Sequence, residues 1–290
     1  IHGSFNQAGS YEEIENKRSP RTFRLSSSRP NLQNIPHRTE LGRRVRAAFV
    51  PRDGWVFVRA DVAQEEPRIA AHLTCDEALL GRFARGEDIY LPVAQAVYDA
   101  VHTNKPRTLT KDDYEWRQLG KTLFLAGLYG ASETRIQQAC AQHNIPVTRA
   151  MAKRVLARMH HEYVVFARLP DMAARDLAAR GYVETMLGHR SSPPAAFLAG
   201  AKRAAGIRQA ANFYIQGTSA GVIKVFMRRV WLGLMRHRLQ AHIVLTVHDE
   251  IVVECLPAGV ATVTALCHEA IQNIIPVALP LDIREATHWE

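Results

Sequence analysis

Two aspartates stand at the ends of apolar, strand-like segments in this 290-residue chain, and their positions suit metal binding. Asp61 ends the segment that follows a turn at 51–54, and Asp249 lies at the tip of a hairpin predicted over 242–254. If that strand lies beside the hairpin, both carboxylates converge on one edge of a sheet. A few carboxylates, completed by substrate phosphates, are the usual ligands of Mg²⁺ in phosphoryl transfer. For either aspartate taken alone, a role as a turn former or cap is the simpler explanation.

A second set of candidates lies on the helix predicted over 112–129. Arg117, Lys121 and Leu125 follow one another at intervals of four, and Tyr129 continues the same face. Cations on such a face can bind a triphosphate, while aliphatic and aromatic groups pack on a base and sugar. A solvated cationic face with Leu125 in the core is the competing interpretation.

Amide and guanidinium groups form a third set. Arg208, Asn212 and Gln216 lie one helical turn apart, on a single face. Such side chains can contact base edges in a minor groove, or they can simply cap and solvate a helix. A polar loop also offers backbone and groove contacts through Arg24, Ser26, Asn31 and Gln33. An ordinary surface loop has the same composition.

The composition is that of a basic globular protein. Lys+Arg number 37 against 28 Asp+Glu, for a net charge of +9, and 30 of the 37 cations are arginine, which suits phosphate recognition. An arginine-rich genome leaves the same bias. No stretch approaches the roughly 18 apolar residues of a membrane span, and the four cysteines are too dispersed for a metal knuckle, which indicates a reduced, intracellular setting. The initial Ile1 suggests a fragment or a processed product.

The elements that must position these residues follow from hydrophobic periodicity. Residues 1–50 are expected to be extended backbone and turns. Helices are predicted over 64–100, 112–129, 148–180, 201–212, 218–239 and 260–275, and strands over 55–61, 242–245, 251–254 and 281–284. This order predicts an α+β core interrupted by a helical subdomain.

Several long strings resemble one family in the correct order. RLSSSRPNLQNIPHRTELGRRVRAAF at 24–49, DVAQEEPR at 61–68, RQLGKTLFLAGLYG at 117–130 and LTVHDE at 245–250 are similar to segments of family A DNA polymerases, the group of bacterial DNA polymerase I. The last three match that family's motifs A, B and C, and 181–190 and 208–224 also match.

The resemblance implies a right-hand polymerase fold, with an antiparallel-sheet palm at 1–66 and 203–290 and inserted helical fingers at 67–202. The family's thumb and exonuclease domains are absent from this chain, so they are expected on the same parent polypeptide or on a separate chain.

The resemblance also implies the roles of individual residues. Asp61, Val62 through its carbonyl, and Asp249 would hold two Mg²⁺ ions, with Mn²⁺ as the alternative. The catalytic set is Asp61, Asp249, Lys121 and Glu250, with Lys121 protonating the leaving pyrophosphate. Glu66 would crowd the sugar 2′-carbon and so reject ribonucleotides. The nucleotide-binding set is Gln64, Glu66, Tyr90, Arg117, Lys121, Leu125 and Tyr129. The DNA-binding set is Arg24, Asn31, Gln33, Arg68, Arg208, Asn212, Gln216 and His248.

Departures from the family pattern are concentrated in motif A, usually written DYSQIELR. Glu65 replaces its isoleucine and Pro67 its leucine, and Pro67 fits only if a helix starts close to it. Leu125 stands where the family usually has Phe or Tyr, and Tyr90 where a His usually contacts triphosphate. We therefore make no prediction of how the protein treats dideoxynucleotides. None of these departures removes a metal ligand, so activity is expected to survive.

The leading interpretation is a DNA-templated DNA polymerase acting on primer–template DNA and dNTPs. The expected location is the bacterial cytoplasm or nucleoid, or a host cytoplasm if the source is a phage, with an organelle as a further setting. A non-catalytic DNA-binding accessory subunit derived from a polymerase is the alternative, and retention of Asp61, Lys121 and Asp249 argues against it. A two-metal nuclease would have no use for the helix at 112–129.

Overall fold

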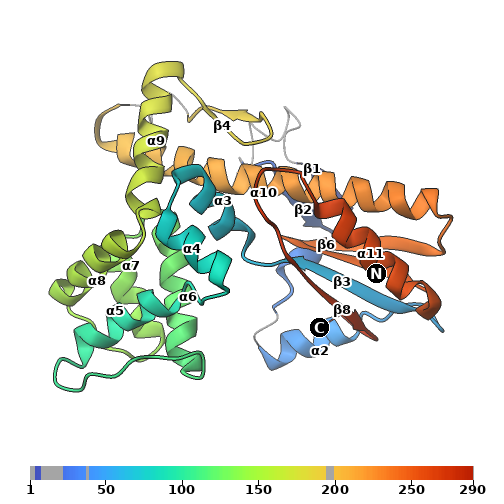
Figure 1. Ribbon diagram of the computed structural model, residues 1–290, viewed down its shortest axis with the longest axis horizontal. Helices are drawn as coiled ribbons and strands as arrows, with labels where there is room; N and C mark the ends of the chain where they lie inside the picture. Colours follow the sequence, from blue (N-terminus) through green and yellow to red (C-terminus); the bar gives the residue numbers. More distant parts are fainter. Residues whose placement is uncertain (1–3, 8–21, 37–38, 194–198, 290) are drawn as a thin grey trace. The chain divides into compact units, whose positions relative to one another are not determined.

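The computed structural model describes residues 4–7, 22–36, 39–193 and 199–289 (Figure 1). These residues belong to two compact units. The first unit comprises Ile1–Glu66, Thr185–His189 and Gln216–Glu290, and the second comprises Pro67–Glu184 and Arg190–Ile215.

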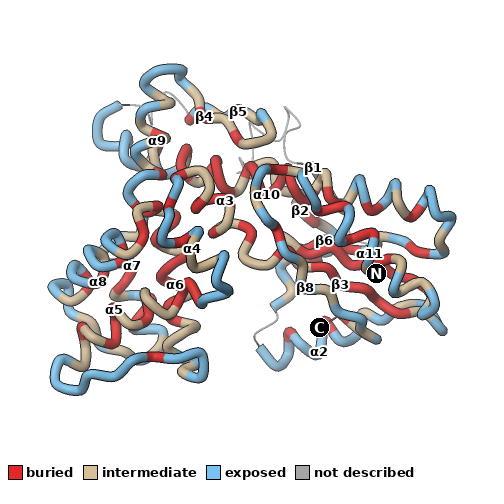
Figure 2. The backbone as a smooth tube through the Cα atoms, in the orientation of Figure 1, coloured by how far each residue is buried: buried red, intermediate tan, exposed pale blue. Residues whose placement is uncertain are grey.

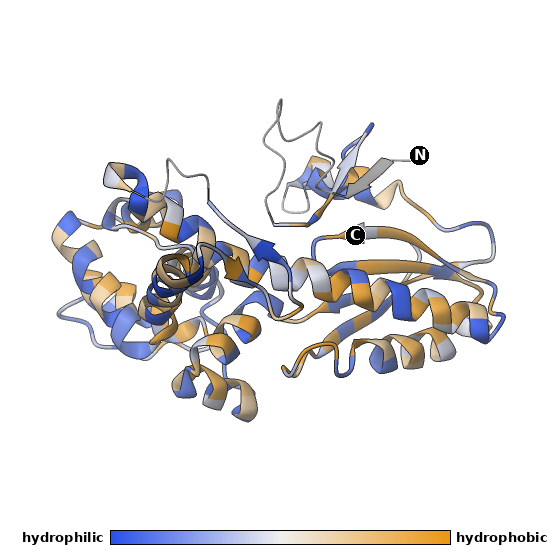
Figure 3. Ribbon diagram, turned by 90° about the horizontal axis from the view of Figure 1, so that it is seen from above, coloured by the Kyte–Doolittle hydropathy of each residue, from blue (hydrophilic) through white to orange (hydrophobic). Residues whose placement is uncertain are grey.

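A four-stranded antiparallel sheet forms the centre of the first unit. Its order is β6 (Ala241–Val247), β7 (Glu250–Cys255), β3 (Val56–Val62) and β8 (Leu281–Ala286). The inner strands are mostly apolar, as the hydropathy colouring in Figure 3 shows, and most of their residues are buried. The predicted strands and the hairpin are therefore confirmed, and the mixture of helix and antiparallel sheet confirms the α+β class.

Apolar residues cover the sheet on both faces. Helix α11 (Val260–Ile271) contacts β3, β7 and β8. A cluster of Leu32, Phe57, Leu245, Val247, Val252 and Trp289 contains alternate residues of the strands. The backbone N–H of Trp289 donates to the carbonyl of Phe49 at 2.9 Å, and the Arg46 guanidinium lies 4.3 Å from the Trp289 ring centroid. Trp289 is thereby held in this core.

The N-terminal region contains more helix than its polar sequence indicates. Strands β1 (Ser4–Gln7) and β2 (Leu25–Ser28) pair, as expected of extended backbone, and Leu32–Asn34 forms one 3₁₀ turn, η1. The expectation of no helix in 1–50 is wrong at α2 (Glu40–Ala47). The Thr39 side chain caps α2 by accepting from the backbone N–H of Gly42 at 3.1 Å. Parts of that expectation, at 1–3, 8–21 and 37–38, fall outside the described residues.

Helices form most of the second unit. They are α4 (Glu77–Arg85), α5 (Leu91–Val101), α6 (Tyr114–Leu128), α7 (Glu133–Gln142), α8 (Arg149–Glu162) and α9 (Val165–Arg180), followed by the short pair β4 (Val183–Glu184) and β5 (Arg190–Ser191). Helices α3 (Glu65–Thr74) and α10 (Arg203–Arg236) each contribute residues to both units. No helix in the described parts of the chain is long and apolar enough to cross a membrane.

Several predicted helices had wrong ends. The segment 64–100 is three helices, because Asp76 caps α4 by accepting from the N–H of Leu79 at 3.0 Å and Gly86 ends it at φ +66°. The segment 148–180 is interrupted between α8 and α9, and α11 ends at Ile271 rather than 275. Helix α7 was not predicted at all.

The segments predicted as two helices, 201–212 and 218–239, form the single helix α10 of 34 residues, preceded by a 3₁₀ turn, η3 (Gly200–Lys202). Burial along much of α10 outweighs the cost of Gly217 in its interior (Figure 2). Helix α3 begins at Glu65, so Pro67 lies in the first turn, where its missing N–H removes no helical hydrogen bond. Helix α3 therefore starts close enough to Pro67 for the proline to fit, as the sequence required.

Helices α5 and α6 approach each other at Gly120. A Cβ atom there would lie 2.4 Å from the carbonyl oxygen of Tyr90 and 3.0 Å from the Cβ of Ala94. We expect Gly120→Ala to lower the free energy of unfolding by about 1–3 kcal/mol, because the backbone of α5 must shift.

Gly81→Ala in α4 is the matched control. Its added Cβ meets only the end of the Arg85 side chain, at 3.0 Å, so removing a helical glycine should raise stability by about 0.5–1 kcal/mol. Urea unfolding followed by circular dichroism measures both, and a Gly120→Ala variant as stable as the native chain would contradict the close approach.

Candidate active site

The two predicted metal-binding aspartates lie side by side at one end of the sheet. In the register of the sheet, Asp61 on β3 lies opposite Glu250 on β7 and, on its other side, opposite Asp282 on β8. The backbone N–H of Val62 donates to the carbonyl of Asp249 at 3.1 Å. The sheet therefore brings together acids from distant parts of the sequence, as the strand-and-hairpin prediction required.

Residues with left-handed backbone lie close to both aspartates in the sequence. His248, at the tip of the β6–β7 hairpin, has φ +57°, and Gln64, just before α3, has φ +55°. Left-handed backbone is uncommon for residues other than glycine, so surrounding contacts must hold it. Such contacts are present at the hairpin: the Thr246 hydroxyl donates to the Glu250 carbonyl at 3.1 Å, and Gln33 Nε2 donates to the Thr246 carbonyl at 3.3 Å.

Concentrated negative charge dominates the electrostatics of this end of the sheet. Burial, followed by the charges of Asp249, Glu250 and Asp282, raises the pKa of Asp61 to about 6. Burial also raises the pKa of Asp249. The guanidinium of Arg59 opposes the rise at Asp61 and binds Glu250 with an N–O distance of 2.5 Å. Ionising both aspartates therefore costs free energy that a cation would offset.

These donors fit divalent cations that complete their coordination with substrate. Among the described residues there is no cluster of three or more Asp, Glu, His or Cys side chains arranged to hold a metal. Two carboxylates and the Val62 carbonyl are hard oxygen ligands, which suit Mg²⁺ when phosphate oxygens and water supply the remaining positions. The arrangement does not suit a closed structural metal site.

Residues predicted to contact nucleotide sugar or DNA surround the acids in the first unit. Arg24 and Glu66 form an ion pair. Partial burial, then the charge of Arg24, lowers the pKa of His248, which favours its neutral form at pH 7. A cavity of about 20 Å³, room for one water molecule, is lined in part by Arg24, Gln33, Ser219, Lys224, Thr246 and His248. Asn31 is exposed and Gln216 is half-buried.

In the second unit, α6 presents the predicted nucleotide-binding side chains on its half-exposed face. Arg117, Lys121 and Leu125 are partly exposed, whereas Leu119, Leu123, Phe124 and Leu128 are buried. Tyr129 follows α6 and is also partly exposed. Leu125 is partly exposed rather than in the core, because a different stripe of α6 enters the core.

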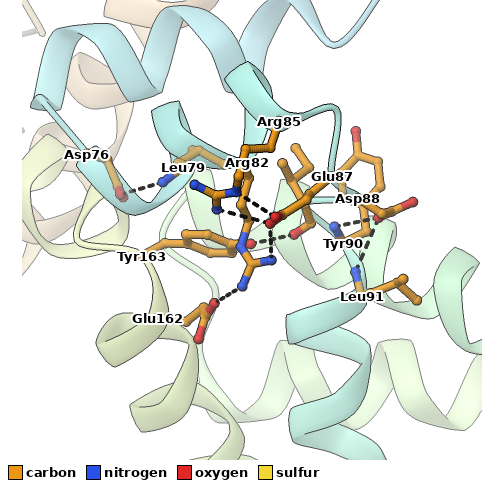
Figure 4. Close-up of polar contacts among 11 residues, drawn as sticks. Asp76, Leu79, Arg82, Arg85, Glu87, Asp88, Tyr90, Leu91, Glu162 and Tyr163 are labelled. Carbon is orange, nitrogen blue, oxygen red and sulfur yellow. Dashed lines mark hydrogen bonds and ion pairs between the residues drawn. The ribbon is translucent and has the colours of Figure 1, made fainter. Parts of the chain in front are cut away.

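A buried aspartate holds Arg117 in place. Asp88 accepts from the backbone N–H of Tyr90 at 2.8 Å and of Leu91 at 3.3 Å, which satisfies the start of α5 (Figure 4). Its other oxygen binds Arg117. Tyr90 is 4% exposed; its ring packs edge-on to Phe124, and the Arg117 guanidinium lies 5.5 Å from its centroid. Tyr90 is therefore packed against Arg117, although the two residues are distant in sequence.

The remaining DNA-binding candidates of the second unit have distinct surroundings. Arg208 Cδ lies beside Gly130, where an added Cβ would be 2.8 Å away, so Arg208 reaches the turn after α6. The Oδ1 atom of Asn212 is buried without a hydrogen-bond partner among the described residues. The Arg68 guanidinium lies 4.3 Å from the Phe83 ring centroid, and burial lowers its pKa.

Sequence reasoning missed the supporting residues of both units. Asp88 could have been found, since an aspartate shortly before a Leu-Pro helix start is a capping signal. Arg59, which pairs with Glu250, and Ser219, which contacts Glu65, gave no signal, because their partners are distant in sequence.

We expect Asp61→Asn to stabilise the protein when divalent cations are removed. The folded-state pKa of about 6 lies above the ordinary 3.8, so the native chain loses stability as pH rises from about 4 to about 6, and the variant does not. The advantage of the variant should be small at pH 4 and reach its full size by pH 7. Urea unfolding in EDTA at both pH values measures it, with the exposed Asp53→Asn as control. A variant that is less stable than the native chain at pH 7 would contradict the repulsion.

The chain is similar to known proteins along its whole length. Residues 1–290 match the family described as DNA polymerase family A. DNA polymerase I of Chloroflexus aurantiacus is 32% identical over 100% of this chain and 29% of its own length, and the thermostable DNA polymerase I of Thermus caldophilus is 36% identical over 92% and 31%. This chain thus spans about three tenths of these relatives.

A solved structure gives the same assignment. It is described as the POL domain of Pol1 from M. smegmatis in complex with DNA primer-template and dNTP, and it matches with a TM-score of 0.83 and 31% identity, over 100% of this chain and 48% of that one. The match over every residue of the sequence and the shared fold lead to one conclusion: the chain belongs to DNA polymerase family A.

Proposed function

We propose that this chain catalyses the template-directed addition of deoxynucleotides to the 3′-hydroxyl of a DNA primer. The observation that carries the proposal is the convergence of Asp61 and Asp249 at the end of an antiparallel sheet, with a raised pKa at each. Family membership, and the DNA primer-template and dNTP in the M. smegmatis complex, support DNA and dNTPs as the substrates.

In this proposal Asp61, Asp249 and the Val62 carbonyl hold two divalent cations, Mg²⁺ or alternatively Mn²⁺. When bound, such ions lower the pKa of the attacking hydroxyl and offset charge on the leaving pyrophosphate. The protein contributes two carboxylates kept close by the pairing of β3 and β7, at a position where Arg59 neutralises the third acid, Glu250. Glu250 is proposed to support the site rather than to replace either ligand.

The partly exposed face of α6 is proposed to bind the triphosphate. Arg117, oriented by Asp88, provides a planar donor for phosphate oxygens. Lys121, one turn later, is proposed to protonate the leaving pyrophosphate. Leu125, Tyr129, Tyr90 and Gln64 complete the proposed nucleotide-binding set, and Glu66 lies against the sugar 2′-carbon.

The rest of the polymerase is proposed to lie outside this chain. Palm is proposed for 1–66 and 203–290 and fingers for 67–202. A thumb and an exonuclease would come from the same parent polypeptide or from a second chain. Primer–template DNA is proposed to contact Arg24, Asn31, Gln33, Arg68, Arg208, Asn212, Gln216 and His248. We also propose that the protein acts in the bacterial cytoplasm or nucleoid.

Primer extension with Mg²⁺ and dNTPs tests the proposal, using the purified chain alone and with any chain that supplies a thumb. Asp249→Ala should lower extension at least about 100-fold, because metal stabilisation of the transition state contributes several kcal/mol. Asp53→Ala, an exposed aspartate in the turn before β3, should leave extension unchanged. Salt-sensitive DNA binding without extension in the native chain would favour the accessory-subunit alternative instead.

Arg117→Lys should raise KM for dNTP about tenfold with a smaller change in kcat. Lysine keeps a charge beside Asp88 but lacks the planar pair of donors, and a charge-assisted hydrogen bond contributes about 1.5–3 kcal/mol. Arg149→Lys, on the exposed side of α8, serves as the matched control. Steady-state kinetics separate the two parameters, and an unaltered KM in Arg117→Lys would remove Arg117 from the proposed triphosphate site.

A further inference from the structure

A buried acid at the start of α3 has no part in the proposed chemistry. Glu65 is only 1% exposed, and the Ser219 hydroxyl of α10 donates to its Oε2 at 2.7 Å. Its Oε1 has no hydrogen-bond partner within the described ranges of the chain. Burying a half-satisfied carboxyl costs free energy, and Glu65 replaces the isoleucine of the usual motif A pattern. The position therefore carries a cost that an apolar residue would avoid.

The segment around Glu65 is held tightly at several points. The backbone N–H of Val62 donates to Asp249, and that of Ala63 donates to the carbonyl of Pro280 at 2.9 Å. The left-handed Gln64 then reverses the chain into α3. The Glu65–Ser219 hydrogen bond is the next attachment, and it ties the first residue of α3 to α10.

The side chain of Glu66, the next residue, has a different partner from that of Glu65. Successive residues of a helix are rotated by about 100° about its axis. While Glu65 faces Ser219 in the interior, Glu66 is only partly buried and forms its ion pair with Arg24. A shift or rotation of the first turn of α3 would thus move the Glu66 carboxylate relative to Arg24 and Asp61.

We propose that Glu65, held by Ser219, is a positioning residue that fixes the Glu66 carboxylate and so sets how strictly the site distinguishes dNTPs from rNTPs. This inference rests on the proposed function, in which Glu66 lies against the sugar 2′-carbon. Glu65 itself touches neither substrate nor metal. Its effect passes through the placement of the first turn of α3.

The protonation state of Glu65 identifies its conservative replacement. Burial raises the pKa of Glu65 to about 8, opposed by the hydrogen bond from Ser219; the charges of Asp249 and Glu66 raise it further and that of Arg24 lowers it. The carboxyl is therefore mostly uncharged at pH 7. Glutamine has the same shape and no charge, and its amide oxygen can accept the Ser219 hydrogen bond.

The test compares the ratio of kcat/KM for a dNTP to that for the matching rNTP on a primed DNA template at pH 7. Glu65→Ile and Ser219→Ala should each lower this ratio about tenfold, the equivalent of losing one buried hydrogen bond. Glu65→Gln should stay within about twofold of the native ratio. Urea unfolding of each variant shows that it is folded, and Glu65→Ile should be at least as stable as the native chain because it removes a buried acid.

Thr218→Ala is the matched control. Thr218 is a fully buried neighbour on α10 whose hydroxyl accepts from the backbone N–H of Met186 at 3.2 Å. It should lose stability and keep the native ratio. Native ratios in Glu65→Ile and Ser219→Ala would overturn the inference, as would an equal loss in Thr218→Ala. If the native chain extends no primer at all, the proposed function fails. If it extends primers but the variants keep the native ratio, only the inference about Glu65 fails.

Discussion

Repulsion between carboxylates held at the end of a packed sheet is the constraint on which the candidate site depends. Strand β3 is paired on both sides, and its alternation leaves Asp61 between Glu250 and Asp282. Helix α11 and the cluster around Phe57 and Trp289 bury the rest of the sheet, so the acids cannot separate without breaking that core. The free energy of burial therefore maintains a charge arrangement that is unfavourable on its own.

Three arginines of the chain each have a carboxylate partner that orients the guanidinium. Arg59 binds Glu250, Arg24 binds Glu66, and Arg117 binds the buried Asp88. Each ion pair fixes the position of a guanidinium group and so the direction of its N–H donors. Arginine suits this purpose because its planar guanidinium can bind one carboxylate and still present N–H groups to a phosphate.

Much of the fold followed from periodicity, and its errors have local physical causes. The β-type segments ending at Asp61 and flanking Asp249 were predicted because buried strands need apolar runs. The single long helix α10 was not, since Gly217 looks like a break and only burial shows otherwise. Helix α2 was not predicted because its sequence is polar, although Thr39 provides an N-cap. The adjacency of the two aspartates was expected. The contacts of the neighbouring acids, Arg59 with Glu250 and Ser219 with Glu65, depend on side-chain packing that residue spacing does not reveal.

The most direct measurement is Mn²⁺ binding, followed by electron paramagnetic resonance, in a complex with dideoxy-terminated primer–template DNA and the next matching dNTP. We expect protein-bound Mn²⁺ in the native chain beyond what the nucleotide and DNA bind alone. This excess should disappear in the double variant Asp61→Asn/Asp249→Asn, whose fold is checked by urea unfolding. Equal Mn²⁺ binding by the folded double variant would contradict the claim that these two carboxylates are the metal ligands.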